Sequence, residues 1–171
     1  MWQRFSNHTR QTIVYAQEEA AKRHEHFLDT EHLLLGILRE TESVTRQVLE
    51  QSGMSVPRLL SELEECISSD GGSTKAEFQL ARGAKRAIDL AYDEARRLRH
   101  GSIEPGHLLL GLIRVEEGLA GQVLSKRDVN LDKLRDAVSN CYPEVPPIPS
   151  PQLFFRQVIR QFTRKEPPSE P

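Results

Sequence analysis

The sequence predicts an all-α protein of eight helices, arranged as two four-helix repeats related by a pseudo-twofold axis. The first observation is an internal repeat, because a shift of 75 positions aligns residues 1–67 with residues 76–142 without a gap. The second is the spacing of apolar residues, which follows the helical period, while no segment alternates with the two-residue period of a strand. We therefore expect helices and no sheet.

The repeat divides the chain into four parts. We expect a first repeat at 1–67, a polar linker at 68–75, a second repeat at 76–142 and a proline-rich tail at 143–171. The most similar segments of the two repeats are His32–Gly36 and His107–Gly111, which share the sequence His-Leu-Leu-Leu-Gly. The tail contains an amphipathic segment at 152–165, which predicts a short additional helix.

Capping residues mark where the helices begin and end. In the first repeat, Ser6, Thr30, Ser43 and Ser55 are the expected N-caps, and Gly53 is expected to end a helix in the left-handed conformation. In the second repeat, Pro105 is expected in a first helical turn and Asn130 as an N-cap. Gly36 and Gly111 lie inside expected helices, so we predict that a second helix approaches closely there.

The composition argues against several functional classes. The net charge of -2 gives no electrostatic reason to expect nucleic acid as a partner. The longest apolar run, Leu33–Leu35, is too short to cross a bilayer, and nothing resembles a signal peptide, so a membrane location is not expected. Cys66 and Cys141 occupy equivalent positions and are predicted to be buried thiols in a reducing, cytoplasmic compartment.

The sequence offers little catalytic chemistry. The segment Gly71–Lys75 has the wrong order for a phosphate-binding loop, and zinc would need more ligands than the two isolated cysteines supply. His32 and His107 are predicted to be packed histidines that hydrogen-bond to nearby backbone, with metal binding or acid–base chemistry as the alternative. The adjacent pairs Glu18–Glu19 and Glu64–Glu65 are predicted to be solvated. We therefore expect no enzyme, cofactor or metal.

These residues resemble a known family. The segment Asp29–Glu40 and its second copy, Glu104–Arg114, are similar to the doubled signature of the N-terminal domain of Clp ATPases, and Arg4–Ser6 opens the chain as the ClpC type does. The resemblance covers about residues 1–142. It implies a non-catalytic, all-helical module that binds adaptor and substrate proteins for an unfoldase and its protease.

The resemblance also implies candidate binding residues. Some ClpC-type domains recognise phosphorylated arginine through a carboxylate at the start of the second helix and a hydroxyl at the start of the preceding long helix. Glu31 and Ser6 match these roles in the first repeat, and Arg10 joins them in the candidate site. In the second repeat Gly106 and Ala81 replace both groups, although Lys85 remains, so that site is predicted to be lost.

Several functions remain open at this point. The leading prediction is a stand-alone accessory, adaptor or regulator of a Clp ATPase or Clp protease, which binds partners in the groove between the repeats. The alternatives are an N-terminal fragment of a ClpC-type ATPase and a small ligand-binding protein or enzyme that uses His32 or His107. The tail carries an apolar stripe that we predict to dock on a partner or to fold back, made of Phe154, Phe155, Val158, Ile159 and Phe162.

Overall fold

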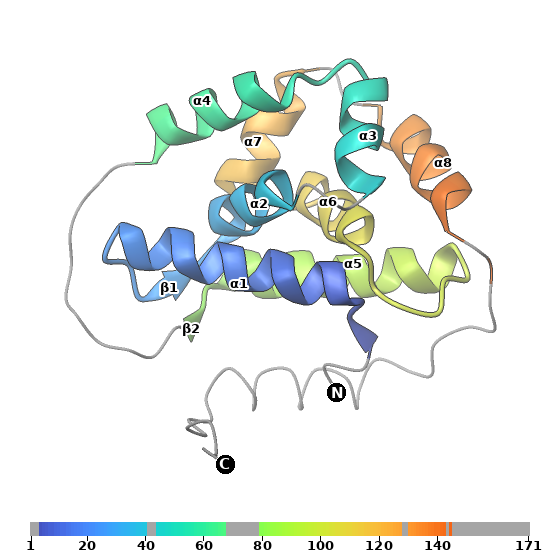
Figure 1. Ribbon diagram of the computed structural model, residues 1–171, viewed down its shortest axis with the longest axis horizontal. Helices are drawn as coiled ribbons and strands as arrows, with labels where there is room; N and C mark the ends of the chain where they lie inside the picture. Colours follow the sequence, from blue (N-terminus) through green and yellow to red (C-terminus); the bar gives the residue numbers. More distant parts are fainter. Residues whose placement is uncertain (1–3, 41–43, 68–78, 128–129, 143, 145–171) are drawn as a thin grey trace, which may run out of the picture.

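The computed structural model describes residues 4–40, 44–67, 79–127, 130–142 and 144. These residues contain eight α-helices, as the repeat predicts, and Figure 1 shows their arrangement. The helices are α1 (Asn7–Lys22), α2 (Thr30–Arg39), α3 (Val44–Gln51), α4 (Val56–Cys66), α5 (Arg82–Arg97), α6 (Pro105–Ile113), α7 (Leu119–Ser125) and α8 (Leu131–Cys141). The all-α prediction is confirmed.

Most of the expected helix boundaries are present. The Ser6 side chain accepts a hydrogen bond from the Thr9 amide at 3.2 Å, and Asn130 caps α8. Gly53 has φ +78°, the left-handed conformation expected after α3. The prediction for Thr30 is wrong by one residue, because Asp29 is the N-cap of α2 and Thr30 is its first helical residue. Ser43 lies outside the described residues.

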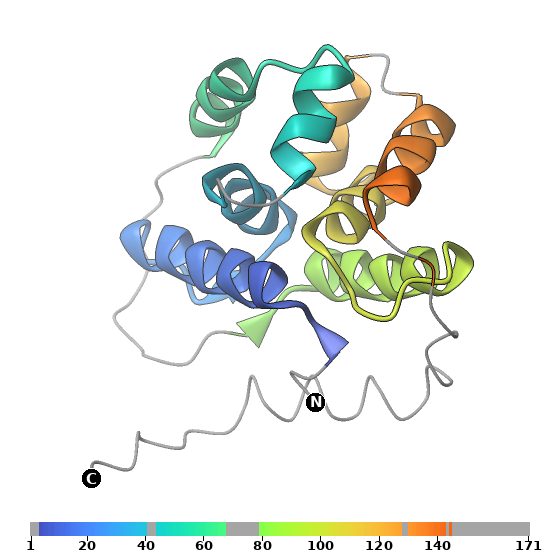
Figure 2. The ribbon, with the colours of Figure 1, turned by 45° about the vertical axis from the view of Figure 1, so that its right-hand side comes forward.

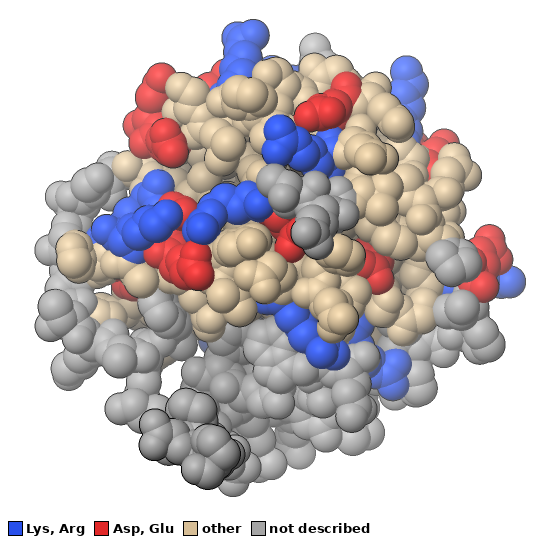
Figure 3. Space-filling view, viewed as in Figure 1, with Lys and Arg blue, Asp and Glu red and all other residues tan. Residues whose placement is uncertain are grey.

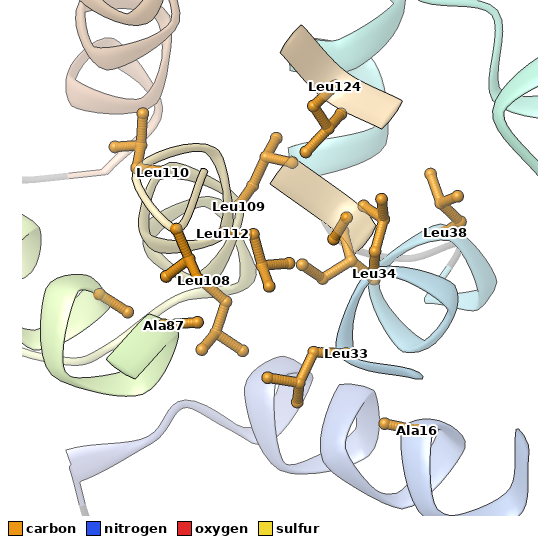
Figure 4. Close-up of a cluster of buried hydrophobic side chains, with 14 of the residues drawn as sticks. Ala16, Leu33, Leu34, Leu38, Ala87, Leu108, Leu109, Leu110, Leu112 and Leu124 are labelled. Carbon is orange, nitrogen blue, oxygen red and sulfur yellow. The ribbon is translucent and has the colours of Figure 1, made fainter. Parts of the chain in front are cut away.

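The core lies between three layers of helices. Figures 1 and 2 show α2 and α6 in the middle, with α1 and α5 on one side and α3, α4, α7 and α8 on the other. Leucines of α2 and α6 meet between the two helices (Figure 4), and the side chains of Leu33, Leu34, Leu108 and Leu109 are fully buried. Burial of this apolar surface is the main stabilising contribution to the fold.

Gly36 and Gly111 explain how the middle layer meets the long helices. A Cβ atom at Gly36 would overlap the carbonyl oxygen of Thr12, and a Cβ atom at Gly111 would overlap that of Ala87. Only glycine therefore allows α2 to approach α1, and α6 to approach α5, this closely. The predicted close approach of helices is confirmed in both repeats.

The two repeats are interleaved rather than packed as separate halves. Helix α3 packs against α6 and α8 of the second repeat as well as against its own repeat. Helix α7 packs against α2 and α4 of the first repeat in the same way. Each repeat therefore completes its partner's core, which supports one cooperative folding unit rather than two.

Short extended segments join the repeats, so the prediction of no sheet is wrong. Strand β1 (Phe27–Leu28) pairs in parallel with β2 (Gln79–Leu80), and a single bridge links Phe5 to Ile103. These pairings are equivalent under the repeat: the residues before each long helix pair with those before the other repeat's short helix. Strands of two residues are too short to show an alternating sequence pattern.

The prediction of two buried thiols is also wrong. Both cysteines are free, but Cys66 is exposed and Cys141 is only partly buried. Each cysteine is the last residue of its helix. The buried residues are Val56, Leu59 and Leu63 in α4 and Leu134 and Val138 in α8. No helix in the described part of the chain has the length and apolar character needed to span a membrane.

Candidate functional site

A cleft of about 660 Å³ opens where the two repeats meet. The start of α2, the first half of α5 and the loop between α6 and α7 form its walls. Its lining residues are mostly charged or glycine: Asp29, Arg82, Gly83, Lys85, Arg86, Asp89, Arg114, Val115, Glu116, Glu117 and Gly118. The sequence predicted a groove between the repeats, but the motif comparison included only Lys85 and Arg114 of its basic residues and not Arg82 or Arg86.

Two glycines hold the walls of the cleft together. A Cβ atom at Gly83 would lie 2.6 Å from the Asp29 Oδ1 atom, and one at Gly118 would lie 2.7 Å from the Thr30 side chain. The beginning of α5 and the loop before α7 are therefore both packed directly on the first residues of α2. This close packing makes the cleft a built feature of the repeat interface.

The cleft presents charges of both signs. Four basic side chains, from Arg82, Lys85, Arg86 and Arg114, face a similar number of carboxylates. Burial, opposed by the charge of Arg86 and assisted by the neighbouring Asp93, raises the pKa of Asp89 to about 6. Such a lining suits a ligand or protein segment that carries both a cationic and an anionic group.

The candidate residues Ser6, Arg10 and Glu31 do not form one site. Ser6 accepts the Arg10 amide N–H at 3.0 Å, so these two residues share the first turn of α1. His8 in the same turn lies 3.6 Å from Glu40, just beyond the end of α2, whereas Glu31 is in the first turn of α2. Ten helical residues rise about 15 Å, so Ser6 and Glu31 lie near opposite ends of α2.

The pseudo-twofold arrangement joins the start of each long helix to the other repeat. The Ser6 amide donates to the carbonyl of Ile103, which precedes α6, and the Ala81 amide donates to the carbonyl of Leu28, which precedes α2. The hydroxyl position of one repeat therefore lies beside the carboxylate position of the other. Ser6 therefore lies near the start of α6, which carries Gly106, and Ala81 lies near the start of α2, which carries Glu31.

The two ends differ in accessibility. A Cβ atom at Gly106 would lie 3.1 Å from both methyl groups of Val138 and 3.6 Å from the Thr45 hydroxyl, so α3 and α8 cover this position. Glu31 remains partly exposed beside the cleft, and burial raises the pKa of its carboxyl. Of the two helix starts, that of α2 is therefore the one accessible to a ligand.

His32 and His107 serve as parts of helix caps. The His32 Nδ1 atom accepts the Asp29 amide N–H at 3.2 Å, and the His107 Nδ1 atom accepts the Glu104 amide N–H at 2.8 Å. Both side chains are fully buried, and burial lowers the pKa of each imidazole. This geometry supports the packed role predicted from the sequence and gives neither ring access to a substrate.

Glu25, Glu31 and His32 are the group closest to a metal-ligand arrangement among the described residues, with ligand atoms within 4.8 Å of one another. The His32 Nδ1 atom already accepts a backbone N–H, so the ring proton resides on Nε2, 3.6 Å from Glu25 Oε2. A metal at Nε2 would move that proton to Nδ1, facing the Asp29 N–H. The hydrogen bonding therefore favours a structural histidine.

The prediction that the Glu18–Glu19 pair is solvated is wrong for Glu19, which is buried in an ion-pair network. Its carboxylate lies 2.8 Å from Arg39 and 2.7 Å from Arg23. The equivalent Glu94 lies 2.9 Å from Arg114 and 2.7 Å from Arg135. Figure 3 shows acidic and basic side chains side by side over α1. The recurrence of Glu19 and Arg39 as Glu94 and Arg114 was the signal that could have revealed both networks.

Comparison with known proteins identifies the family. The model of the Clp repeat (R) N-terminal domain matches residues 4–95 and again residues 79–164. The chain belongs to the Clp N-terminal domain family. The matches to this Clp N-domain overlap at α5 and extend into the tail, whose apolar stripe of Phe154, Phe155, Val158, Ile159 and Phe162 lies outside the described residues.

The Clp N-domain here is similar to the first part of much longer proteins. It is 36% identical over 138 residues to the chaperone protein ClpB of Oceanobacillus iheyensis, and this alignment covers 81% of this chain and 17% of ClpB. It is also 36% identical over 135 residues to the Clp protease ATP-binding subunit ClpC of Staphylococcus aureus, which covers 79% of this chain and 16% of ClpC. The chain thus spans about one sixth of the length of these relatives.

Solved structures share the fold. The N-terminal domain of the ClpD chaperone from Arabidopsis thaliana matches with a TM-score of 0.63 and 24% identity, over 82% of this chain and 98% of that one. The N-terminal domain of Hsp104 from Candida albicans matches with a TM-score of 0.64 and 12% identity, over 78% and 87%. The eight-helix architecture is therefore that of a Clp N-domain.

Proposed function

We propose that this chain is a non-catalytic interaction module that acts with a Clp-type unfoldase or protease and binds adaptor or substrate proteins in the charged cleft. The observation that carries the proposal is the cleft itself, which lies at the interface of the repeats and is lined by acidic and basic side chains. Membership of the Clp N-domain family supports it. The burial of His32 and His107 argues against the alternative of an enzyme that uses these rings.

The cleft also supports a more specific ligand class, a side chain that carries both a guanidinium and a phosphate. Asp29 and Glu31 at the start of α2 would accept the guanidinium. The basic side chains of Arg82, Lys85 and Arg86 would meet the phosphate, in the place where Ala81 supplies no hydroxyl. Phosphoarginine in an unfolded protein has this chemistry.

This role is the same in a free accessory protein and in a longer chain. The matched part of ClpB and ClpC is about one sixth of each protein, so in those relatives the matched region belongs to a much longer chain. A stand-alone module with the same cleft would bring bound proteins to an unfoldase or would compete with its own N-terminal domain for them.

Charge reversal in the cleft tests the proposal. The probe is an unfolded protein phosphorylated on arginine, compared with its unphosphorylated form, and binding is measured by calorimetry. The double variant Arg82→Glu/Lys85→Glu should weaken binding of the phosphorylated probe by about tenfold or more, because it replaces two phosphate contacts by repulsion.

The matched control is Lys126→Glu/Lys133→Glu, which makes the same change of net charge at exposed positions on α7 and α8. Its affinity should stay within about twofold of wild type. Equal weakening by both double variants would mean that net charge and not the cleft determines binding, and no binding to either probe by the wild-type chain would refute the proposed ligand class.

A further inference from the structure

Three rings meet at the corner formed by the end of α5, the start of α6 and the end of α8. The rings of His100 and His107 lie 5.0 Å apart between centroids, and Tyr142 lies 5.6 Å from the first and 6.0 Å from the second. Both histidines are buried, with exposed fractions of 1% and 0%. Tyr142 follows α8 directly, so this corner holds the end of the last helix against the rest of the domain.

The hydrogen bonds fix where the protons are. The His107 Nδ1 atom accepts the Glu104 amide N–H at 2.8 Å, so the ring proton of His107 resides on Nε2. This N–H donates to the Nδ1 atom of His100 at 2.8 Å, and His100 is therefore neutral with its own proton on Nε2. The pair is a chain of hydrogen bonds that exists only while both rings are neutral.

A further proton on either ring breaks this chain. On His100 it would occupy Nδ1 and face the N–H of His107, and on His107 it would occupy Nδ1 and face the Glu104 amide. Two facing donors at this separation repel each other. Protonation therefore requires the rings to separate, and the ring of Tyr142 packs against both.

The surroundings do not offset this conflict. The charged groups that face His100 are Glu104 at the start of α6 and Glu144 beyond α8, and both favour its protonated form, as does the backbone of Ser139 in α8. Burial outweighs them and lowers the pKa of His100, and burial together with His100 lowers the pKa of His107 to about 3. The pair stays neutral as long as the corner stays closed.

The first repeat provides an internal comparison. Glu25 occupies the place of His100 on the same backbone, because its amide donates to the Ala20 carbonyl at 3.0 Å and that of His100 donates to Ala95 at 2.9 Å. The Glu25 carboxylate lies 3.6 Å from His32 Nε2, so the first repeat has a carboxylate where the second has the imidazole of His100. The position of Tyr142 is taken by Ile67, so the first repeat has no equivalent ring cluster.

We propose that the His100–His107 pair is an acid-released latch that holds the last turn of α8, through Tyr142, against α5 and α6. Acid opens the latch because the rings take up protons only when they separate. Opening frees Tyr142 and the last turn of α8 from the corner. The proposal does not depend on what the charged cleft binds.

Linkage gives the size of the effect. A solvent-exposed histidine has a pKa of about 6.5, whereas burial lowers the pKa of His107 to about 3 in the closed corner, so at one pH unit below 6.5 the release of His107 favours the open form about tenfold. The pKa of His100 is also lowered by burial in the closed corner, so its release increases this factor further. One pH unit above 6.5 the same factor is close to one, so the latch stays closed.

Amide hydrogen exchange of the complete chain at pH 7.5 and pH 5.5, corrected for the intrinsic rate, tests the latch. Protection of residues 137–142 should fall at least about tenfold at the lower pH, while the equivalent residues 62–67 of the first repeat should change less than about twofold. In His100→Gln, whose amide can still accept the His107 N–H but does not titrate, the fall should be smaller than in wild type, because only His107 still takes up a proton on opening. The matched control His8→Gln should retain it.

Two results would overturn the proposal. One is an equal loss of protection in wild type and in His100→Gln, and the other is no acid-dependent loss in wild type. If His100→Gln does not fold, nitrogen-detected NMR of the histidine rings in the wild-type chain replaces it. Protonation of His100 must then follow the same pH dependence as the loss of protection, and a difference between the two would also overturn the latch.

Discussion

The strongest single test of the core packing concerns Glu19 and Glu94, two buried glutamates at equivalent positions of the two repeats. Glu94 is fully buried, and its carboxylate receives two hydrogen bonds from Arg135, at 2.7 and 2.9 Å, and one from Arg114 at 2.9 Å. Glu19 has the equivalent position, but its partners include Lys22, which is 60% exposed. The second repeat uses Arg135 from α8, where the first repeat has Leu60.

The substitution Glu94→Gln should therefore cost more than Glu19→Gln. Removing one member of a buried ion pair leaves an uncompensated charge and costs about 3–5 kcal/mol. We expect about 3 kcal/mol for Glu94→Gln, because Arg135 is 11% exposed and keeps a second contact with Asp132. For Glu19→Gln we expect about 1 kcal/mol, because two of its three cationic partners, Lys22 and Arg39, are 60% and 32% exposed and are screened by water.

Urea unfolding followed by circular dichroism at neutral pH measures both values. The pH dependence adds a check, since the Arg135 guanidinium and its neighbours lower the pKa of Glu94 although burial opposes them. A carboxyl whose pKa is lower in the folded state stabilises the protein above its unfolded pKa, and this contribution disappears as the pH falls through the folded value. Equal costs for the two substitutions, or a cost below about 1 kcal/mol for Glu94→Gln, would refute the reasoning.

Further outcomes follow from individual contacts. Gly111→Ala should destabilise the fold by about 1–3 kcal/mol in urea unfolding, because the new methyl group overlaps the Ala87 carbonyl; unchanged stability would contradict this close approach. Ser6→Ala should cost about 1 kcal/mol in the same assay through loss of the bond to the Thr9 amide, and a stable variant would contradict the cap. The pKa of His107 is about 3 in the folded state, so as the pH falls below about 6.5 the unfolded chain takes up this proton first. The free energy of unfolding of wild type should therefore fall by about 2 kcal/mol between pH 7.5 and pH 5, and His107→Gln should not show this loss. Equal losses in both proteins would contradict the buried neutral ring.

Local sequence signals predicted what local forces determine. Ser6, Gly53 and Asn130 mark helix ends through contacts within a few residues, and the structure has them at the expected places. Glycine inside a helix predicted a close approach because no local reason favours it there, and Gly36 lies against α1 as expected. Because the sequence repeats, the four helices expected in the first repeat also predicted four helices in the second.

Contacts over long distances in the chain were less accessible. Glu19 was judged by its neighbour in sequence, whereas its partner Arg39 lies twenty residues away. Ser6 and Glu31 were paired because they belong to one repeat, but the twofold arrangement brings the start of each long helix to the segment before the short helix of the other repeat. The same arrangement creates the cleft, so its lining, including Arg86 and Asp89, depends on tertiary structure that no local motif encodes.

A binding footprint tests the central claim most directly, that partners dock in the cleft between the repeats. Amide exchange is measured on the chain alone and with a saturating amount of the arginine-phosphorylated unfolded protein. The account predicts slower exchange in residues 82–89 and 114–118, with residues 131–141 of α8 unchanged. Protection centred on α8, with no change in the two cleft segments, would contradict it.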